Sequence, residues 1–498
     1  MAKKIIGAAL FIFVIFLFCY FRLKPLYFQT VGYTYDQGRD FLKAAEIIQD
    51  KNITFIGPTT GIQGLFHGAW YYYLLTIPFL IFKGAPIGFY YFNFFIQFVS
   101  FVFFAYFLHK FFGSQVSLII SLLIASSPYF IFTSIFVGNN IMVLPVFLAF
   151  LIANFYLLEK KIKKPQLLLL IIGLLLGFTT EFELAFGLFL IPVYLLITTL
   201  LKNFRSIFYA KKNFLLFLSG LFIPFIPRLL FELKNNFMQT RILWSYLMHP
   251  SGQNTRLYSQ IVQERINLFY GYFTSLFVND FLFKIFFILF ILTAYFFLEN
   301  KIKKYHYSVN FFLLLIIFLF FLSTLNNGGF FWGNYFEGIQ YLILIILASI
   351  LSFQLQTQSV ILDFLKVGVL IVIFLLNLNS ILKSNNSKPN AVGTLKLQTQ
   401  VVNYIFQKEQ QMDTYCVKVY TPPVIPHTYN YLFLYGNISK HYPLPKNDWV
   451  KRKCWYIVET DENNERRTEW LEKNIPRKAK TAHKKLFNDV EIILYELN

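Results

Sequence analysis

Two carboxylates and a guanidinium stand close together in a polar stretch near the N-terminus, where their types suit acid–base chemistry. Asp36 and Asp40 are one helical turn apart, and Arg39 lies between them. A carboxylate can take a proton from a hydroxyl or an amine, and a guanidinium can bind an anionic group beside it. An acid near the start of a helix also serves as an N-cap, so this alternative for Asp36 stays open.

Acidic residues are scarce in most of the chain, which makes each of them informative. Only 13 of the 25 acids precede residue 383. Carboxylates at membrane depth are costly and tend to line a polar cavity or pathway. Six of these acids are expected on one face of a membrane, and most of them flank apolar stretches: Asp36, Asp40, Glu181, Glu183, Glu232 and Glu337. They predict a cavity that opens on that face, and six unrelated interfacial charges are the alternative.

Basic residues expected on the same face are candidates for binding and stabilising an anionic group. They are Arg39, Lys43, Arg228, Arg241 and Arg256. Arg228 ranks first because it follows Pro227 near a helix end, where an unpaired cation would be costly. A pair with Glu232, four residues later, explains Arg228 equally well.

A run rich in glycine, proline and threonine extends from Gly57 to Gly68. This composition predicts an irregular backbone held in a fixed shape, which a simple connection does not need. His67 lies near its end and is either a ligand or acid–base group, or a structural hydrogen-bonding residue. The structural role is the more common one for a single histidine in such a loop.

Helices that cross a membrane must position these residues. Of the 498 residues 56% are hydrophobic and only 14% are charged, and the mean hydropathy is +0.53. The chain also contains repeated apolar runs of about 18 or more residues, which is long enough to cross a membrane. These runs exclude a soluble enzyme, a disordered binder and a nucleic-acid-binding protein. We predict eleven spanning helices, at about residues 5–20, 87–108, 116–136, 139–158, 166–181, 183–201, 213–231, 281–298, 309–325, 338–354 and 360–378.

Charge orients these helices. Four basic clusters fall on one side, which the positive-inside rule makes cytoplasmic, if the short apolar segment 69–82 does not cross. The clusters are Lys3-Lys4, Lys160–Lys164, Lys202–Lys212 and Lys301–Lys304. We therefore expect segment 69–82 to be tucked against the membrane and the N-terminus to be cytoplasmic. Loops 24–68 and 232–280 and the tail are then extracytoplasmic, and the protein is placed in the cytoplasmic membrane.

Loop 24–68 contains a predicted amphipathic helix that lies along the membrane surface with Asp36 near its start. One side of this helix is apolar, and the other carries Asp40, Lys43 and Glu46. Loop 232–280 interleaves aromatic residues with arginines. Aromatic rings there can stack on a ligand, and anchoring at the interfacial aromatic belt explains them about as well.

A shift to polar composition near Lys383 marks a soluble domain, 383–498. Its pattern predicts helices at 398–411, 429–435 and 464–473, and strands at 415–419, 455–459 and 491–496, as in a small α/β domain. Cys416 and Cys454 both fall in this domain and can pair if it is extracytoplasmic, so the sequence leaves their pairing open.

The motifs described above resemble those of the GT-C superfamily of integral-membrane glycosyltransferases, in particular the protein mannosyltransferase and aminoarabinose transferase branch. The segments that carry the resemblance are Tyr35–Asp40, Gly57–Gly68, Tyr71–Leu74, Ser127–Phe130, Gly138–Asn140, Gly177–Glu183 and Pro227–Lys234. The resemblance covers about residues 1–270 and implies a catalytic membrane module there. Residues 271–382 are expected to form variable further spanning helices.

This resemblance implies that Asp36 is the catalytic base and that the donor is a sugar on a polyprenyl phosphate. Candidate substrate-binding residues are Arg39, Asp40, Lys43, His67, Asn139, Asn140, Glu181, Glu183, Arg228 and Glu232. Two positions depart from the pattern of the branch. Gln37 follows Asp36 where a glutamate is frequent, and Asn139-Asn140 stands where an acid is frequent. Either the sugar or the acceptor is bound differently in this subgroup, or Glu181 or Glu183 supplies the second acid.

We therefore expect an inverting glycosyltransferase, because a single carboxylate base suffices for inversion. A secondary transporter, or a flippase or ligase of lipid-linked glycans, is the alternative, although no duplicated pattern relates the two halves of the chain. Metal use stays open, with Asp36 and Asp40 as candidate ligands of a divalent cation. No other cofactor and no nucleic acid is expected, and the sugar and the acceptor stay undetermined.

Overall fold

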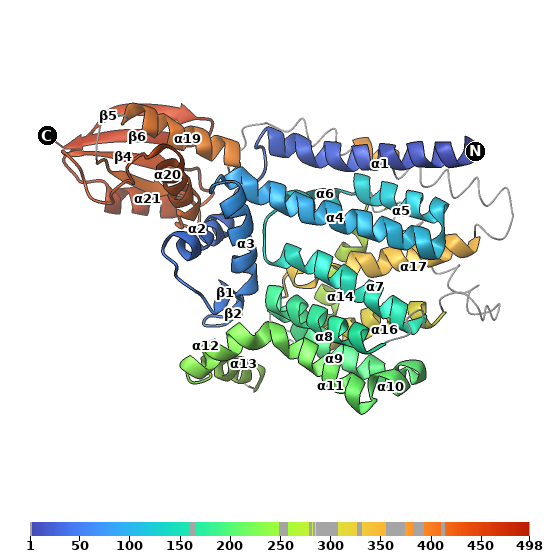
Figure 1. Ribbon diagram of the computed structural model, residues 1–498. Helices are drawn as coiled ribbons and strands as arrows, with labels where there is room; N and C mark the ends of the chain where they lie inside the picture. The colour runs from blue at the N-terminus through green and yellow to red at the C-terminus, as the bar shows by residue number, and fades with distance from the viewer. Residues whose placement is uncertain are drawn as a thin grey trace.

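Long helices run side by side through the larger part of the molecule, and a mixed sheet with its own helices lies beyond one end of them (Figure 1). The computed structural model describes residues 2–159, 165–248, 257–277, 281, 284, 307–325, 331–354, 374–379, 381, 393–409 and 414–497. Its helices are α1 (Ala2–Tyr27), α2 (Tyr35–Gln49), α3 (Trp70–Ile81), α4 (Pro86–Phe112), α5 (Ser114–Ser126), α6 (Pro128–Ile135), α7 (Val143–Leu158), α8 (Pro165–Phe182), α9 (Leu184–Leu200), α10 (Lys202–Phe208), α11 (Lys211–Phe222), α12 (Ile226–Lys234), α13 (Met238–Met248), α14 (Tyr258–Thr274), α16 (Tyr307–Thr324), α17 (Ile339–Gln354), α19 (Leu395–Lys408), α20 (His427–Lys440) and α21 (Asn464–Asn474). Short 3₁₀ turns are η1 (Asn140–Met142), η2 (Ile223–Phe225) and η3 (Gly333–Phe336). The strands are β1 (Ile56–Thr59), β2 (Phe66–Gly68), β3 (Val417–Tyr420), β4 (Lys453–Val458), β5 (Ala479–Phe487) and β6 (Val490–Leu497).

The chain is an integral membrane protein. Five described helical segments are long and apolar enough to cross a membrane: Ile5–Tyr27, Pro86–Phe112, Asn140–Leu158, Pro165–Phe182 and Lys211–Lys234. Shorter apolar helices accompany them at Trp70–Ile81, Leu184–Leu200, Val309–Thr324 and Ile339–Ser349. Most of two further predicted spans, 281–298 and 360–378, lies outside the described residues. The prediction of a polytopic helical membrane protein is confirmed.

The predicted span 116–136 is a broken one. α5 and α6 meet at Ser127-Pro128 with a bend of 64°, because proline has no N–H and its ring clashes with the preceding turn. Arg22 of α1 is fully buried beside the break and donates to the carbonyl oxygens of Ile124 and Ala125, both at 3.1 Å. Carbonyl groups left free at the end of a helix carry partial negative charge, so they compensate the buried guanidinium.

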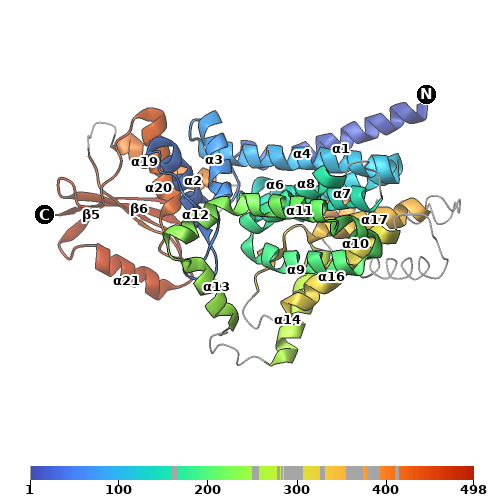
Figure 2. The ribbon, with the colours of Figure 1, turned by 60° about the horizontal axis from the view of Figure 1, so that its bottom comes forward.

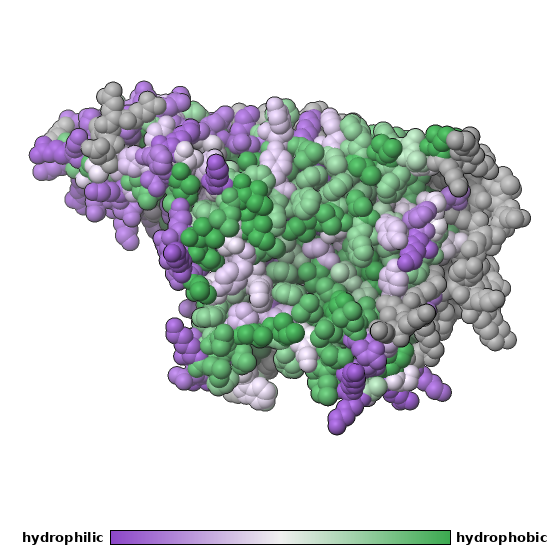
Figure 3. All heavy atoms as spheres, viewed as in Figure 1, coloured by the Kyte–Doolittle hydropathy of each residue, from purple (hydrophilic) through white to green (hydrophobic). Residues whose placement is uncertain are grey.

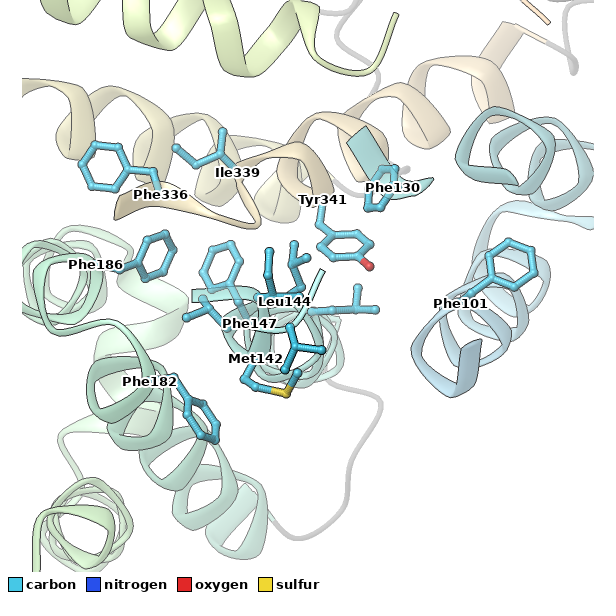
Figure 4. Packing of buried hydrophobic residues seen from close by; sticks show 14 of the residues in the cluster. Phe101, Phe130, Met142, Leu144, Phe147, Phe182, Phe186, Phe336, Ile339 and Tyr341 are labelled. Atoms are coloured by element: carbon cyan, nitrogen blue, oxygen red, sulfur yellow. The ribbon is translucent and has the colours of Figure 1, made fainter. Parts of the chain in front are cut away.

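Phenylalanine builds much of the core of the helical part. Phe147 of α7 meets Phe186 of α9 edge to face at a ring-centroid distance of 5.0 Å, and Phe130 of α6 lies 5.3 Å from Tyr341 of α17 (Figure 4). Such aromatic pairs are favourable beyond the area that they bury. Many of the phenylalanines therefore contribute to packing.

α3 runs across the ends of the long helices rather than alongside them (Figure 1, Figure 2). Its 12 residues, with Pro78 among them, are too few for a span of about 20. Trp70 and Tyr73 tie it down, since the indole N–H donates to the carbonyl of Pro224 at 2.7 Å and the phenol to that of Thr54 at 2.6 Å. Segment 69–82 thus lies over one end of the bundle.

Hydrophobic and hydrophilic surfaces separate along the molecule. A broad hydrophobic belt covers the helices between the hydrophilic C-terminal domain at one end and a hydrophilic region over α10 and the start of α11 at the other (Figure 3). The N-terminus lies at the same end as α10 (Figure 1). The basic residues Lys202, Arg205, Lys211 and Lys212 therefore lie at the end opposite the C-terminal domain.

The C-terminal domain has a four-stranded sheet in the order β3-β4-β6-β5, in which β3 and β4 are parallel and the other pairs antiparallel. A small C-terminal α/β domain was predicted and is confirmed. Cys416 and Cys454 form a disulfide beside the parallel pair, with their Cα atoms 4.6 Å apart. Strand β5 was missed because it is an exposed, lysine-rich edge strand without an apolar face.

Candidate active site

Asp36 stands in the first turn of α2 but does not cap it. Thr34 is the N-cap, and the side-chain oxygen of Gln37 accepts from the backbone N–H of Thr34 at 2.9 Å. The same oxygen accepts from the hydroxyl of Tyr90 at 3.1 Å. Gln37, one of the two departures from the family pattern, therefore holds the start of α2 in place. The N-cap interpretation of Asp36 is wrong, which leaves its carboxylate for another role.

Arg39 joins the two carboxylates of α2. Its Nη1 lies 2.8 Å from Asp36 and its Nη2 lies 2.8 Å from Asp40. The surroundings of the two acids differ sharply, because the side chain of Asp36 is 49% exposed and that of Asp40 only 3%. One guanidinium between two carboxylates is well compensated, so in this arrangement Arg39 is not a free anion-binding group.

Asp40 does not share the solvent-facing side of α2 with Lys43 and Glu46, as the amphipathic pattern had predicted. It is buried against α3, where Tyr71 and Tyr72 are close enough to affect its charge electrostatically. Burial raises the pKa of Asp40 to about 7, although the Arg39 guanidinium acts in the opposite direction. Lys43 lies 3.0 Å from Glu46, on the same helix.

Two glycines allow the hairpin β1–β2 to approach the helices. The strands are antiparallel, with Ile56 opposite Gly68. A Cβ on Gly57 would lie 2.1 Å from the carbonyl oxygen of Gly68, and one on Gly68 would lie 1.9 Å from Oε2 of Glu181. Both distances are far shorter than any real carbon contact. The Gly57–Gly68 run therefore needs glycine at these positions so that the hairpin backbone can lie on the carboxylate of Glu181.

Arg228 pairs with Glu181 rather than with Glu232. Its Nε lies 2.7 Å from Glu181, whose side chain is fully buried at the end of α8, and its Nη1 donates to the carbonyl of Phe66 at 2.9 Å. Nη1 also donates to Gln239 at 3.2 Å. Gln239 was not among the predicted site residues, because a single glutamine in a polar loop carries no distinguishing signal.

Glu232 has a different task. Its carboxylate accepts from the backbone N–H groups of Gln239 at 3.0 Å and Thr240 at 2.9 Å, and from the hydroxyl of Thr240 at 2.7 Å. These donors belong to the first turn of α13, where a negative charge is favourable. The Arg228–Glu232 pair expected from the spacing of four residues is therefore wrong.

His67 is a buried, neutral hydrogen-bond acceptor. Its Nδ1 accepts from the backbone N–H of Leu184 at 3.3 Å and lies 4.0 Å from Glu183. Burial lowers the pKa of His67 to about 3, and the charges of Arg228 and Arg39 lower it further. A neutral imidazole forms no ion pair with Glu183. The geometry thus favours the structural role over acid–base chemistry.

The second departure from the family pattern is Asn139-Asn140, which lies near Glu183 and Glu337. Asn139 donates to the carbonyl of Phe182 at 2.8 Å, and Asn140 lies next to the carboxylate of Glu337. Glu337 also accepts from the hydroxyl of Tyr129 and interacts electrostatically with Glu183. Tyr129 belongs to the Ser127–Phe130 motif, whose sequence does not mark it as a site residue. Of the two remaining arginines, Arg241 is exposed on α13 and Arg256 lies outside the described residues.

These contacts form one polar network at the end of the bundle that carries the C-terminal domain. Ion pairs join Asp36 to Arg39 and Arg228 to Glu181. The link between these two pairs is electrostatic rather than a direct contact, since the charges of Arg39 and Arg228 both affect His67. Among the described residues no cluster of three or more His, Cys, Asp or Glu side chains could hold a metal ion. Asp36 and Asp40, the candidate metal ligands, are both bound by Arg39.

Comparison with protein families and with curated proteins finds no match. Two solved structures are similar to this chain over most of its length. ArnT from Cupriavidus metallidurans bound to undecaprenyl phosphate matches with a TM-score of 0.57 at 10% identity, covering 99% of this chain and 98% of ArnT. An Archaeoglobus fulgidus oligosaccharyltransferase, in complex with zinc and sulfate, matches with a TM-score of 0.50 at 13% identity, covering 88% of this chain and 62% of that protein.

The chain has the GT-C fold. The predicted resemblance is confirmed at the level of the fold, and it extends beyond residues 1–270 to nearly the whole chain. Within this GT-C fold, α2, the β1–β2 hairpin and the ends of α8 and α12 bring the predicted acids and arginines together.

Proposed function

We propose that this protein is an inverting glycosyltransferase that uses a sugar linked to a polyprenyl phosphate, with Asp36 as the general base. The observation that carries the proposal is the accessibility of Asp36 within an otherwise buried acidic network. Its side chain is 49% exposed, whereas those of Asp40, Glu181 and Glu183 are 3% exposed or less. A base must reach the acceptor that it deprotonates. The undecaprenyl phosphate bound to the structurally similar ArnT supports this class of donor.

The transfer needs one base and one group that stabilises the departing phosphate. Asp36 takes the proton of the acceptor hydroxyl or amine, the acceptor atom bonds to the anomeric carbon, and the bond from that carbon to the phosphate oxygen breaks. The electron pair remains on the polyprenyl phosphate. No covalent sugar–enzyme intermediate is required, so the anomeric configuration inverts.

Arg39 is placed to respond to this proton transfer. It lies 2.8 Å from Asp36 before the reaction. Protonation removes the negative charge of Asp36 and weakens its hold on Nη1 of Arg39. That N–H group then becomes available as negative charge grows on the leaving phosphate, which is when stabilisation lowers the barrier.

We place the reaction on the extracytoplasmic face. The disulfide between Cys416 and Cys454 lies in the domain that covers the site, and disulfides persist in oxidising compartments. The basic residues of α10 and α11 lie at the opposite end, where the positive-inside rule expects the cytoplasm.

The test uses the purified full-length protein in lipid nanodiscs, incubated with radiolabelled polyprenyl-phosphate sugars and a membrane lysate as the source of acceptors. Labelled product identifies a transferase and the class of its acceptor. We expect Asp36→Asn to lower the rate at least ~100-fold, since a general base contributes about 10² to 10⁴. The matched control is Glu46→Gln, which removes an acid of the same helix whose partner is Lys43.

Asp36→Asn with near-wild-type turnover would contradict the role of Asp36. Movement of the labelled lipid between leaflets without any labelled product would instead favour a flippase or transporter. Size-exclusion elution identical to that of the wild type shows that each variant is folded.

A further inference from the structure

The C-terminal domain holds the backbone just before Asp36. Residues 29–33 form a ladder with the first described residues of that domain: the N–H of Tyr33 donates to Gly393 at 2.7 Å, that of Leu395 to Val31 at 3.0 Å, and that of Lys396 to Gln29 at 3.0 Å. These are regular backbone hydrogen bonds between segments more than 350 residues apart in the sequence. The approach to α2 is therefore fixed by the far end of the chain.

The same domain contacts the backbone just after Asp36. A Cβ placed on Gly38 would lie 2.5 Å from the carbonyl carbon of His427 and 2.7 Å from its oxygen. The obstacle is the backbone of the first turn of α20, which cannot rotate away as a side chain could. Only glycine permits this approach, so α2 and α20 are packed backbone to backbone within two residues of Asp36.

Aromatic packing extends this contact along α2. The rings of Phe41 and Tyr431 lie 5.4 Å apart edge to face, and both side chains are fully buried. The hydroxyl of Tyr431 donates to the carbonyl of Gly84, beyond the end of α3, at 2.8 Å. Helix α20 thus binds both α2 and the segment after α3.

His427 brings a titratable side chain to the catalytic helix. Its backbone adjoins Gly38, and its ring lies close enough to Asp36 and Arg39 for both to act on it electrostatically. Its Nδ1 is buried and has no hydrogen-bond partner among the described residues. The backbone contact at Gly38 brings this unpaired ring nitrogen to the helix that carries Asp36 and Arg39, so it can hydrogen-bond with either group if the pair rearranges towards it.

We propose that the C-terminal domain positions the catalytic base by gripping the chain on both sides of Asp36, and that His427 is a positioning residue for the Asp36–Arg39 pair. We call these contacts, of residues 29–33 with 393–396 and of Gly38 with His427, the grip. Its role in catalysis rests on the proposed function, whereas its existence does not. Displacements near 1 Å at a reacting group cost about 100-fold in rate. Loosening the grip should therefore slow turnover without weakening the binding of the lipid donor.

Gly38→Ala tests the grip, and Gly271→Ala is its matched control. Both glycines lie in helices, but a Cβ on Gly271 meets nothing within 4 Å. We expect Gly38→Ala to lower kcat at least tenfold with KM for the donor within twofold of wild type, and to speed amide hydrogen exchange across 35–45. Gly271→Ala should match the wild type in both measurements. Equal exchange in the two variants would overturn the proposal.

His427→Ala and His427→Gln separate the ring from the backbone contact. We expect His427→Ala to lower kcat about tenfold with unchanged KM for the donor, and His427→Gln, which keeps a hydrogen-bonding group, to recover at least half of the loss. Wild-type kcat in His427→Ala would overturn the role of this side chain. If the wild type transfers no sugar at all, the proposed function fails, but the exchange comparison at residue 38 still decides whether the grip exists.

Discussion

Asp36 and Asp40 are neighbours on one helical turn and both pair with Arg39, yet the solvent exposure of their side chains differs. The carboxylate of Asp36 faces solvent next to Nη1 of Arg39, whereas that of Asp40 is enclosed between α2 and α3. An accessible acid can meet a substrate, and an enclosed acid can only anchor the arginine. The proposed roles, with Asp36 as the base and Asp40 as its support, are based on this difference.

Asp40 should make the protein less stable as the pH rises. Its folded-state pKa is about 7, raised by burial, whereas an unfolded aspartate titrates near 4. Between these values the folded state binds more protons than the unfolded state, so stability is full below about pH 4 and is lost as the pH rises through 7. His67 acts with the opposite sign over much of this window, so the test is the difference between two proteins. The thermal midpoint of the wild type in detergent should fall, relative to that of Asp40→Asn, as the pH rises from 4 to 7, and parallel profiles of the two proteins would contradict the raised pKa.

His67 should contribute with the opposite sign. Its pKa is lowered to about 3 by burial, so the unfolded state gains a proton near pH 6.5 while the folded state does not. Stability from this residue is present above 6.5 and is lost as the pH falls towards 3. His67→Asn should remove this acid sensitivity and keep an acceptor for the N–H of Leu184. His67→Ala should cost roughly 1–3 kcal/mol at neutral pH, because it leaves that N–H buried without a partner.

Residue types and short spacings identified several of the site residues correctly. They were less successful at predicting the partner of each residue. The Tyr35–Asp40 motif and the scarcity of acids pointed to Asp36, Glu181 and Arg228, which the structure places in one network. The spacing of four residues suggested Glu232 as the partner of Arg228. The true partner, Glu181, is 47 residues away, and only the packing of α8 against the segment that leads into α12 brings it there. His427 and Gln239 were missed for the same reason.

At the scale of elements, the β1–β2 hairpin connects the surface helix to the bundle. It presents the carbonyl of Phe66 to Arg228 and the ring of His67 to the start of α9. Its Gly68 lies directly on Glu181. A change in this hairpin is therefore transmitted to the buried ion pair.

Gly68→Ala should break the Glu181–Arg228 pair. The new Cβ would lie 1.9 Å from the Glu181 carboxylate, which must move away from Arg228. Breaking a buried pair costs about 3–5 kcal/mol, so we expect a large drop in the thermal midpoint together with weak activity. Gly32→Ala is the control, since a Cβ on Gly32 meets nothing within 4 Å. Equal midpoints for the two variants would show that the hairpin is not packed on Glu181.

Helices that can be identified from the length of an apolar run were predicted well. Elements that depend on a break within such a run, or on pairing with a neighbouring strand, were not. Long apolar runs such as 87–108 and 139–158 coincide with α4 and with the span Asn140–Leu158. The break at Ser127-Pro128 lies within an unbroken apolar run, so hydropathy does not show it. Strand β5 has no apolar alternation, because its pairing with β6 rather than its own burial makes it a strand.

At the scale of the whole molecule, the disulfide should contribute strongly to the stability of the C-terminal domain. It closes a loop of 38 residues, which in the chain-entropy description corresponds to roughly 4 kcal/mol. The double substitution Cys416→Ser with Cys454→Ser should make this domain melt earlier and, through α20, reduce activity. Cys19→Ser, at the free cysteine of α1, is the control. Limited proteolysis that cuts all three proteins equally would contradict this coupling.

The contact between α20 and the first loop also bears on the order of events during synthesis. The hydroxyl of Tyr431 binds the carbonyl of Gly84 across 347 residues of sequence. At about 5–20 residues per second, the ribosome needs roughly 20–70 s to make the intervening chain. During that time α2 lacks its final partner. Under the proposed function, a chain whose C-terminal domain has not yet folded transfers no sugar, because nothing yet holds Asp36 in position.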